Sequence, residues 1–133
     1  MQNICLIIGA GAGIGGNVAK VFANDGYHVY LTRRSDENGL KKIISKSKGM
    51  IIITCFSSNI SRIKSILKIA NTLEKKVCVL GRALKRSIDA GMEVGIIDRN
   101  YKIYSLNDIN LFGKDQFIIL SSGSQGEPNS SLT

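Results

Sequence analysis

Short apolar runs alternate with stretches of helical periodicity along most of the chain. The apolar runs cover residues 3–8, 28–32, 50–56, 77–80, 101–104 and 117–120. They show too little polar alternation for strands with one face in water, and suit parallel strands covered on both faces. Between them, apolar residues recur at the three- and four-residue spacing of amphipathic helices. This alternation predicts an α/β fold with a mostly parallel sheet and helices on both faces.

Five helical segments are predicted between these runs, and their apolar spacing covers residues 14–23, 40–48, 60–73, 82–88 and 105–109. The polar residues 35–38 have the character of a helix start for the second. Gly26 suits the left-handed position that follows a helix. Residues 57–59, Ser-Ser-Asn, offer N-cap side chains to the third helix. Gly91 and Gly95 are expected to end the fourth helix, and Ser105 to cap the fifth.

A glycine-rich loop joins the first apolar run to the first predicted helix. It contains two overlapping patterns, Gly11-x-Gly13-x-x-Gly16 and Gly9-x-x-x-Gly13-x-Gly15. Missing side chains let a backbone approach a pyrophosphate at the positive N-terminus of a helix. The first pattern fits the general dinucleotide fingerprint. We prefer the second pattern as the description of this loop. Strand, loop, helix and strand together predict a Rossmann-like, nucleotide-binding start to the chain.

Residues 4–34 resemble the opening strand, helix and strand of the short-chain dehydrogenase/reductase family, which carries the second glycine pattern. The resemblance implies NAD(P) binding by residues 1–45. Arg33 and Arg34 stand where an acidic residue would bind the ribose of NAD, and guanidiniums can instead pair with a 2′-phosphate, which predicts NADP. The alternative is that both arginines are solvated surface side chains. The predicted cofactor-binding residues are Gly9, Gly13, Ile14, Gly15, Arg33 and Arg34.

A second loop rich in glycine and serine, residues 121–128, follows the last apolar run. Its glycines allow successive backbone amides to converge on one anion, and Ser121, Ser122 and Ser124 add hydroxyl donors. The loop therefore predicts a phosphate site. An ordinary polar turn after a strand has a similar composition, and this alternative stays open.

Three segments resemble the ribonuclease J family, in the β-CASP portion of those metallo-β-lactamase-fold nucleases. Residues 121–128, Ser-Ser-Gly-Ser-Gln-Gly-Glu-Pro, are similar to the family's Thr-Gly-Ser-Gln-Gly-Glu-Pro. Residues 56–62, Phe-Ser-Ser-Asn-Ile-Ser-Arg, are similar to its Phe-Ala-Ser-Asn-Ile-x-Arg, and residues 81–84, Gly-Arg-Ala-Leu, to its Gly-Arg-Ser-Met. Their order and spacing agree with the family, and the resemblance covers about residues 46–133.

The three loops that carry this resemblance all follow predicted parallel strands, so they should gather at one edge of the sheet. The resemblance implies that this crevice holds the RNA backbone or a terminal phosphate, with Ser122, Ser124 and Gln125 as donors and Arg82 as a charge partner. The predicted phosphate- and RNA-binding residues are Ser57, Ser58, Asn59, Arg62, Gly81, Arg82, Ser122, Gly123, Ser124, Gln125, Gly126 and Glu127.

The formal net charge of +8 is spread unevenly along the chain. Residues 1–45 hold five basic and three acidic side chains, a balance of +2, whereas residues 46–133 hold thirteen and seven, a balance of +6. A positive field attracts polyanions, which is consistent with an RNA partner, although many basic surfaces bind none.

Membrane and metal roles find no support in the composition. No apolar run approaches the roughly 20 residues that span a bilayer, and we expect no signal peptide. Cys5, Cys55 and Cys78 lie in apolar runs without a metal-ligand spacing, which predicts buried, reduced thiols in a cytoplasmic protein. His28 is the only histidine, so we expect no histidine-built metal site and assign His28 a structural role in a strand.

Neither family's catalytic machinery is found in the sequence, and we predict no catalytic residue and no turnover by the chain alone. Ribonuclease J family members cleave RNA with metal held by histidine-rich motifs, and neither Asp36 nor Glu37 is matched to the family's acidic motif. The dehydrogenase family's Tyr-x-x-x-Lys is also absent, because none of the four tyrosines has lysine four places later.

The chain is therefore interpreted as two truncated α/β segments, residues 1–45 and 46–133, joined near residues 35–48. Three hypotheses stay open. The chain is an RNA-binding β-CASP-like segment, an NADP-binding segment of an oxidoreductase, or a chimera that folds without a function.

Overall fold

A computed structural model describes residues 4–8, 14–32 and 37–122 of the chain. Within them the chain forms one six-stranded sheet in which every paired strand is parallel, with five helices. The strands are β1 (Ile4–Ile8), β2 (His28–Thr32), β3 (Ile51–Thr54), β4 (Lys76–Leu80), β5 (Ile103–Tyr104) and β6 (Phe117–Ser121). The helices are α1 (Ile14–Asn24), α2 (Glu37–Lys46), α3 (Ile60–Thr72), α4 (Arg82–Glu93) and α5 (Leu106–Phe112).

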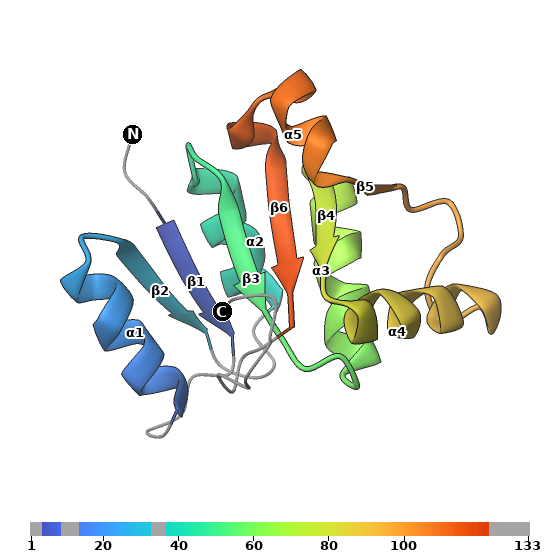
Figure 1. Ribbon diagram of the computed structural model, residues 1–133, viewed down its shortest axis with the longest axis horizontal. Coiled ribbons are helices and arrows are strands. Elements are labelled where there is room, and N and C mark those ends of the chain that lie inside the picture. The colour runs from blue at the N-terminus through green and yellow to red at the C-terminus, as the bar shows by residue number, and fades with distance from the viewer. Residues whose placement is uncertain (1–3, 9–13, 33–36, 123–133) are drawn as a thin grey trace.

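The strand order is β2-β1-β3-β6-β4-β5, shown in Figure 1. From β1 the chain passes through α1 to β2 at one edge of the sheet, and from β3 it passes through α3 towards the other edge. These neighbouring strands therefore send their connections in opposite directions. Such a switch point opens a crevice at the carboxyl ends of the strands, where α/β proteins bind ligands.

Strands from both predicted segments share this one sheet. β1 pairs with β3 from Ile4 opposite Ile51 to Ile7 opposite Thr54. The sheet is thus continuous across the junction. The predicted division between residues 45 and 46 falls in the last turn of α2, and it stays a prediction.

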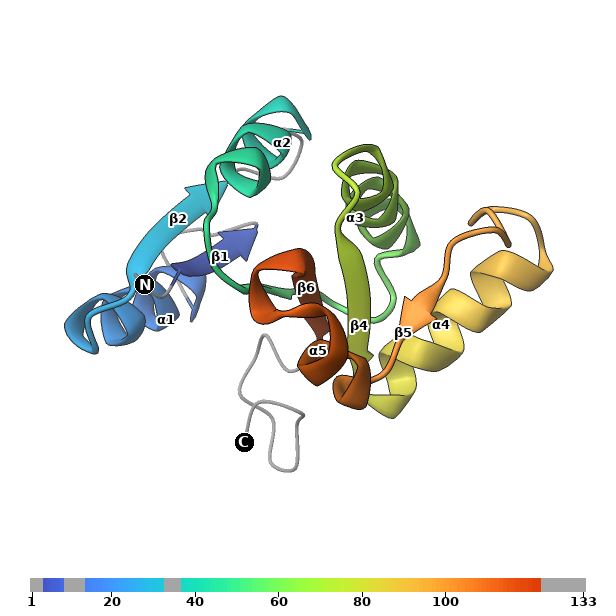
Figure 2. The ribbon, with the colours of Figure 1, turned by 90° about the horizontal axis from the view of Figure 1, so that it is seen from above.

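Helices cover both faces of the sheet, as the sequence predicted. Figure 2 shows α2 and α3 on one side and α1 and α5 on the other. Alternate residues of β3 explain the division, because Ile51 and Ile53 join the cluster of α2, α3 and α4, whereas Ile52 packs with the cluster of α5. The side chains of Cys5 and Ile7 form a third cluster with Ala19 of α1.

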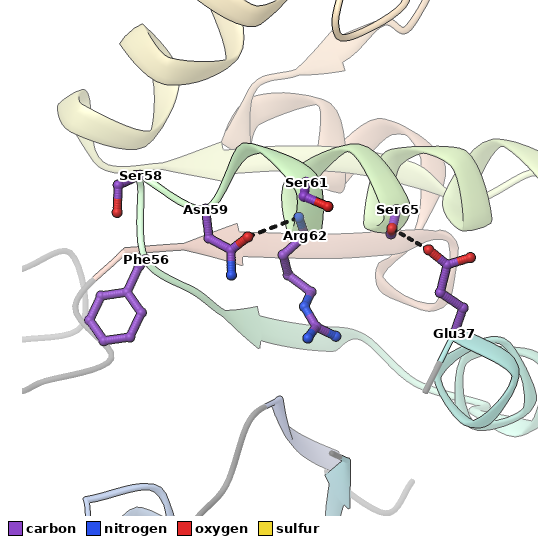
Figure 3. Close-up of a pocket in the computed structure, with 7 residues that line it drawn as sticks. All are labelled: Glu37, Phe56, Ser58, Asn59, Ser61, Arg62 and Ser65. Atoms are coloured by element: carbon purple, nitrogen blue, oxygen red, sulfur yellow. Dashed lines mark hydrogen bonds between the residues drawn. The ribbon is translucent and has the colours of Figure 1, made fainter. Parts of the chain in front are cut away.

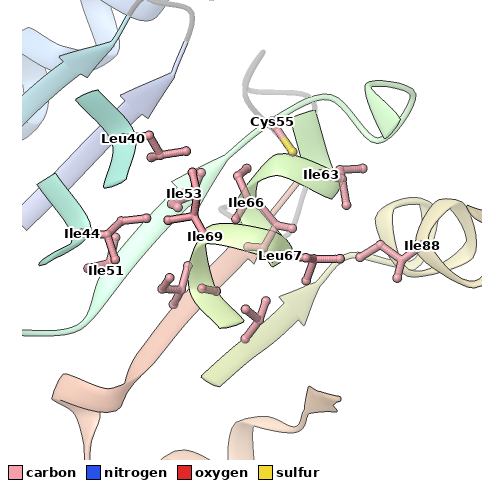
Figure 4. Packing of buried hydrophobic residues seen from close by; sticks show 14 of the residues in the cluster. Leu40, Ile44, Ile51, Ile53, Cys55, Ile63, Ile66, Leu67, Ile69 and Ile88 are labelled. Carbon is pink, nitrogen blue, oxygen red and sulfur yellow. The ribbon is translucent and has the colours of Figure 1, made fainter. Parts of the chain in front are cut away.

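The largest core lies between the sheet and the helices α2, α3 and α4 (Figure 4). Ile44, Ile51, Ile53, Ile63 and Ile66 are all fully buried there. Burying a side chain of this size stabilises the fold by roughly 1.5–3 kcal/mol. The central strand β6 is buried along its whole length, so the point where it ends is fixed by packing on both faces.

Several element boundaries differ from the sequence prediction. β3 ends at Thr54 instead of Phe56, whose ring is 49% exposed. α2 begins at Glu37, within the polar residues 35–38 that were expected to start it, and ends at Lys46 instead of near Lys48.

α4 passes through Gly91, where Ile97 packs so closely that a Cβ would come within 2.9 Å of its Cδ1. The helix ends at Glu93, and Gly95, with a positive φ of 78°, follows its C-cap residue Val94, which confirms the prediction for Gly95.

Three capping predictions are confirmed by the structure. Asn59 is the N-cap of α3, and Gly26, two residues after the end of α1, adopts a positive φ of 82°. Ser105 starts α5, and both its backbone amide and its hydroxyl donate hydrogen bonds to Asp108 Oδ2, at 2.8 and 2.9 Å.

Candidate functional site

Three strands end side by side at the carboxyl edge of the sheet. In the register of the sheet, Ser121 of β6 lies opposite Thr54 of β3 and opposite Leu80 of β4. Hydrogen bonds continue the pairing beyond the strands, from the Cys55 amide to Ser121 O at 3.1 Å and from the Ser122 amide to Leu80 O at 3.3 Å. The loops that follow β3, β4 and β6 therefore start next to one another, as the sequence predicted.

The loop after β3 leads into the N-terminus of α3. Asn59 is the N-cap, and its Oδ1 accepts the backbone amide of Arg62 at 3.1 Å. This bond orients the Asn59 side chain and leaves its amide N–H₂ group to donate elsewhere. Ser57 is half-buried and Ser58 is exposed.

Arg62 lies in the first turn of α3 and is half-buried. Among the described residues, no carboxylate pairs with its guanidinium and no hydrogen bond from its side chain is found. An unpaired cation beside a helix N-terminus attracts anions, because the helix dipole adds to its positive potential.

The loop after β4 is a single glycine. Gly81 has φ 105° and ψ 128°, a conformation that is accessible essentially to glycine alone, and it is the N-cap residue of α4. Arg82 follows as the first residue of the helix and is exposed. The tight turn places a second helix N-terminus and a second guanidinium-bearing residue next to the end of β6.

The loop after β6 begins within the described part of the chain. Ser121 is fully buried and donates its hydroxyl to Ser122 O at 2.9 Å, which removes it from the list of free donors. Ser122 is half-buried. The other predicted site residues of this loop lie outside the described residues, and their assignment stays a prediction: Gly123, Ser124, Gln125, Gly126 and Glu127.

A cavity of about 600 Å³ opens beside the loop after β3 (Figure 3). It is lined by Glu37, Phe56, Ser58, Asn59, Ser61, Arg62 and Ser65. The side chains of Phe56, Asn59 and Arg62 point to the same side of the segment that joins β3 to α3. Gly81, Arg82 and Ser122 do not line the cavity, so the strand-end loops and the cavity overlap only in the first loop.

Sequence reasoning missed four of the lining residues. Phe56 was placed inside a strand, and Glu37 was left without a role. Ser61 and Ser65 are one helical turn apart on α3, and their spacing could have placed them on the face that carries the cavity. The Ser65 hydroxyl donates a hydrogen bond to Glu37 Oε1, which links α3 to the start of α2.

The three cysteines are buried thiols of low reactivity. Burial raises the pKa of the Cys55 thiol from its ordinary 9.0 to about 11, and the Arg62 guanidinium offsets part of that rise. Burial also raises the pKa values of Cys5 and Cys78. All three thiols are buried and free, and at neutral pH they stay protonated and so are poor nucleophiles.

The glycine loop of the predicted dinucleotide site lies mostly outside the described residues. This holds for Gly9, Gly13, Arg33 and Arg34, whereas Ile14 and Gly15 open α1. The surrounding order does match the prediction, because β1 and β2 are parallel neighbours joined by α1. NADP binding stays a prediction.

The described residues contain neither a cluster of metal-ligand side chains nor a membrane-spanning helix. No group of three or more His, Cys, Asp or Glu side chains is placed to hold a metal ion within residues 4–8, 14–32 and 37–122. No helix in those same ranges is both long and apolar enough to cross a bilayer.

Comparison with known proteins places most of the chain in one family. Residues 48–133 match the family described as "Ribonuclease J, beta-CASP domain". "Ribonuclease J" of Sinorhizobium meliloti is 32% identical over 101 residues, 76% of this chain and 18% of that protein. "Ribonuclease J" of Mycoplasma pneumoniae is 35% identical over 94 residues, 70% of this chain and 16% of that protein. "Ribonuclease J 2" of Staphylococcus epidermidis is 34% identical over 98 residues, 73% of this chain and 18% of that protein.

The chain thus spans less than a fifth of the length of these relatives. The matches support the ribonuclease J resemblance of the larger segment. They give no support to the dehydrogenase resemblance of residues 1–45, which stays a prediction.

Proposed function

The chain belongs to the ribonuclease J β-CASP domain family over residues 48–133, and from this premise we propose that it binds RNA phosphates at the carboxyl edge of β3, β6 and β4. The observation that carries the proposal is the register of these strands. Thr54 and Leu80 both lie opposite Ser121, so three loops begin at one place.

The chemistry of this edge suits a phosphate. The first turn of α4 has no side-chain cap, so its backbone amides can donate to an anion, whereas the Ile60 and Arg62 amides of α3 already donate to Ser58 O and Asn59 Oδ1. Both helices direct the positive ends of their dipoles to this edge. Arg62 and Arg82 add two cations, and guanidiniums pair with phosphate oxygens in a bidentate manner. The balance of +6 over residues 46–133 supports the attraction of a polyanion over a longer range.

Binding without cleavage is the activity we propose for this chain. Its single histidine, His28, cannot supply the several imidazoles of a histidine-rich metal centre. Incubation of single-stranded RNA with the chain in the presence of manganese or zinc tests this point. Hydrolysis above the level of a metal-only control contradicts it.

Paired variants on each helix test the location of the RNA site. Arg62→Gln and Lys68→Gln each remove one positive charge from α3, but only Arg62 lies in the first turn. Arg82→Gln and Arg86→Gln form the same comparison on α4. We expect the Arg62 and Arg82 variants to weaken RNA binding and to lower the slope of log K against log salt by about 0.7 each, the value for one lost contact to a single strand.

The controls decide between a site and a general positive charge. Equal losses for the two members of each pair contradict the proposed location. A Ser124→Asp change supplies a further test, since it would place a carboxylate where the loop after β6 is expected to hold a phosphate, and undiminished RNA binding by that variant contradicts the assignment of this loop.

NADP binding by residues 1–45 is a second proposal. The observation that favours it is the parallel pair β1 and β2 with α1 between them, starting at Ile14 directly after the glycine loop. Arg33 and Arg34 are proposed to select NADP over NAD through the 2′-phosphate.

A further inference from the structure

We propose that the cavity beside the loop after β3 binds a guanine base, which the Glu37 carboxylate recognises while the attached phosphate lies at the N-terminus of α3, beside Asn59 and Arg62. The ligand is therefore a guanosine nucleotide, either free or within RNA. This inference rests on the proposed function, because that function supplies the phosphate end of the site.

The cavity has the size and the lining of a base pocket. Its volume of about 600 Å³ lies within the range of roughly 300–1,000 Å³ that is typical of small-molecule sites. Glu37 lines one end of the cavity and Phe56, which is 49% exposed, lines the other, with Asn59 and Arg62 between them (Figure 3). An exposed aromatic ring at that second end suits the base of a neighbouring nucleotide in a single-stranded RNA.

Its charges argue for a base in addition to a phosphate. Arg62 and Glu37 both line the cavity, yet no ion pair joins them in the described part of the chain. A carboxylate repels a phosphate, so a site for phosphate alone would not include Glu37. A nucleotide satisfies both ends, because its phosphate is an anion and its base carries N–H donors.

Glu37 is held in place for this role. It lies in the first turn of α2, and the Ser65 hydroxyl of α3 donates to its Oε1 (Figure 3). No partner of Oε2 is found among the described residues. The carboxylate is thus oriented from one side and retains lone pairs for a ligand.

Guanine matches a carboxylate better than the other three bases. Its N1–H and N2–H₂ groups are adjacent donors, which a carboxylate accepts with its two oxygens. Adenine offers a donor beside an acceptor, uracil a single donor between acceptors, and cytosine a single amino group. The Asn59 amide N–H₂ remains available to donate to an acceptor on the ligand, since its Oδ1 is already bonded.

Calorimetric titration of the 133-residue chain with GMP, AMP, CMP and UMP tests the assignment. We expect GMP to bind about tenfold more tightly than AMP, the discrimination that one bidentate contact provides. Glu37→Gln keeps an oxygen for Ser65 but replaces an acceptor by a donor, so it should abolish the preference or shift it to AMP. Glu93→Gln removes the same charge from an exposed residue of α4 and should leave the preference unchanged.

Phe56 supplies a second test that does not depend on charge. Phe56 lies at the end of the cavity away from Glu37, with Arg62 between them (Figure 3), so Phe56→Ala should leave the binding of all four mononucleotides unchanged, and a loss of GMP binding in this variant would contradict the placing of the base at Glu37. The two RNA tetramers pGpApApA and pApApApA then identify the source of the base. If pGpApApA binds more tightly than GMP, the natural ligand is RNA. If pGpApApA and GMP bind with equal affinity, the natural ligand is a free nucleotide. Either result supports the base site, provided that pGpApApA binds more tightly than pApApApA.

Equal affinities for the four nucleotides, unchanged by Glu37→Gln, would overturn the inference while leaving the proposed function intact if RNA still binds with the expected salt dependence. Absence of binding to both nucleotides and RNA would overturn the proposed function and the inference together.

Discussion

Asn59 offers the sharpest separation of folding from binding, because one side chain serves both. Its Oδ1 caps α3 through the Arg62 amide at 3.1 Å, and its amide N–H₂ group faces the candidate site. Asn59→Ala removes both groups. Asn59→Asp retains a capping oxygen, since aspartate caps helices as well as asparagine does, but it adds a negative charge at the proposed phosphate site.

The expected stability effects follow from the cap. Loss of an N-cap oxygen costs about 1 kcal/mol. At an unfolding entropy of about 2.1 cal/mol/K per residue, a chain of 133 residues would lose about 3.5 °C in Tm. Asn59→Asp should unfold at or slightly above the temperature of the unmodified chain, because a carboxylate also interacts favourably with the helix N-terminus.

For RNA binding we expect the opposite order, with Asn59→Asp more impaired than Asn59→Ala. Asn59→Asp should weaken RNA binding by more than about tenfold, because like charges placed together cost several kcal/mol, whereas Asn59→Ala should weaken it less. Thermal unfolding followed by circular dichroism and RNA binding followed by fluorescence anisotropy measure the two properties. The reasoning is refuted if Asn59→Asp unfolds as early as Asn59→Ala, or if it binds RNA as the unmodified chain does.

Two further predictions follow from the structure and a third from the sequence. Gly81→Ala should lower the free energy of unfolding by roughly 1–3 kcal/mol, because alanine is strained at φ 105°, and urea unfolding with no measurable loss would contradict the turn geometry. Burial raises the pKa of Cys55 from 9.0 to about 11, so the folded state holds this proton more tightly, and stability should be full below about pH 9 and fall as the pH rises towards 11. A Cys55→Ala variant should lack this part of the pH dependence in urea titrations. Fluorescence titration should show NADP bound more tightly than NAD, and preference for NAD or no binding at millimolar cofactor would count against Arg33 and Arg34.

The sequence was sufficient for the architecture because hydrophobic pattern and strand length are local signals. Continuous apolar runs such as residues 117–120 predicted buried parallel strands, and β6 is buried throughout. The same signal failed at Phe56, because an apolar residue at the end of a run has the same pattern whether its ring is buried or exposed. The prediction that Gly91 ends α4 was wrong, because the sequence does not distinguish a glycine that makes room for a packed side chain, here Ile97, from a glycine that ends a helix.

The candidate site was only partly predictable for a related reason. Residues 57–62 and 81–82 could be found from the sequence, because motifs next to strand ends are contiguous in the chain. Glu37 could not, since its place beside Ser65 depends on how α2 packs next to α3, and the two residues are far apart in sequence. Long-range packing of this kind leaves no local pattern.

The central claim is that three strand-end loops form one RNA-phosphate site, and amide chemical shifts in a ¹⁵N-labelled chain test it most directly. Titration with a 5′-phosphorylated single-stranded RNA should shift the amides of residues 57–62 and 81–82 and of Ser122 most strongly. An internal control for general attraction to positive charge lies at the opposite, amino-terminal ends of β4 and β6, where residues 74–76 and 114–116 carry Lys75, Lys76 and Lys114. The claim would be contradicted if the largest shifts occurred at these amino-terminal ends and the strand-end loops shifted little.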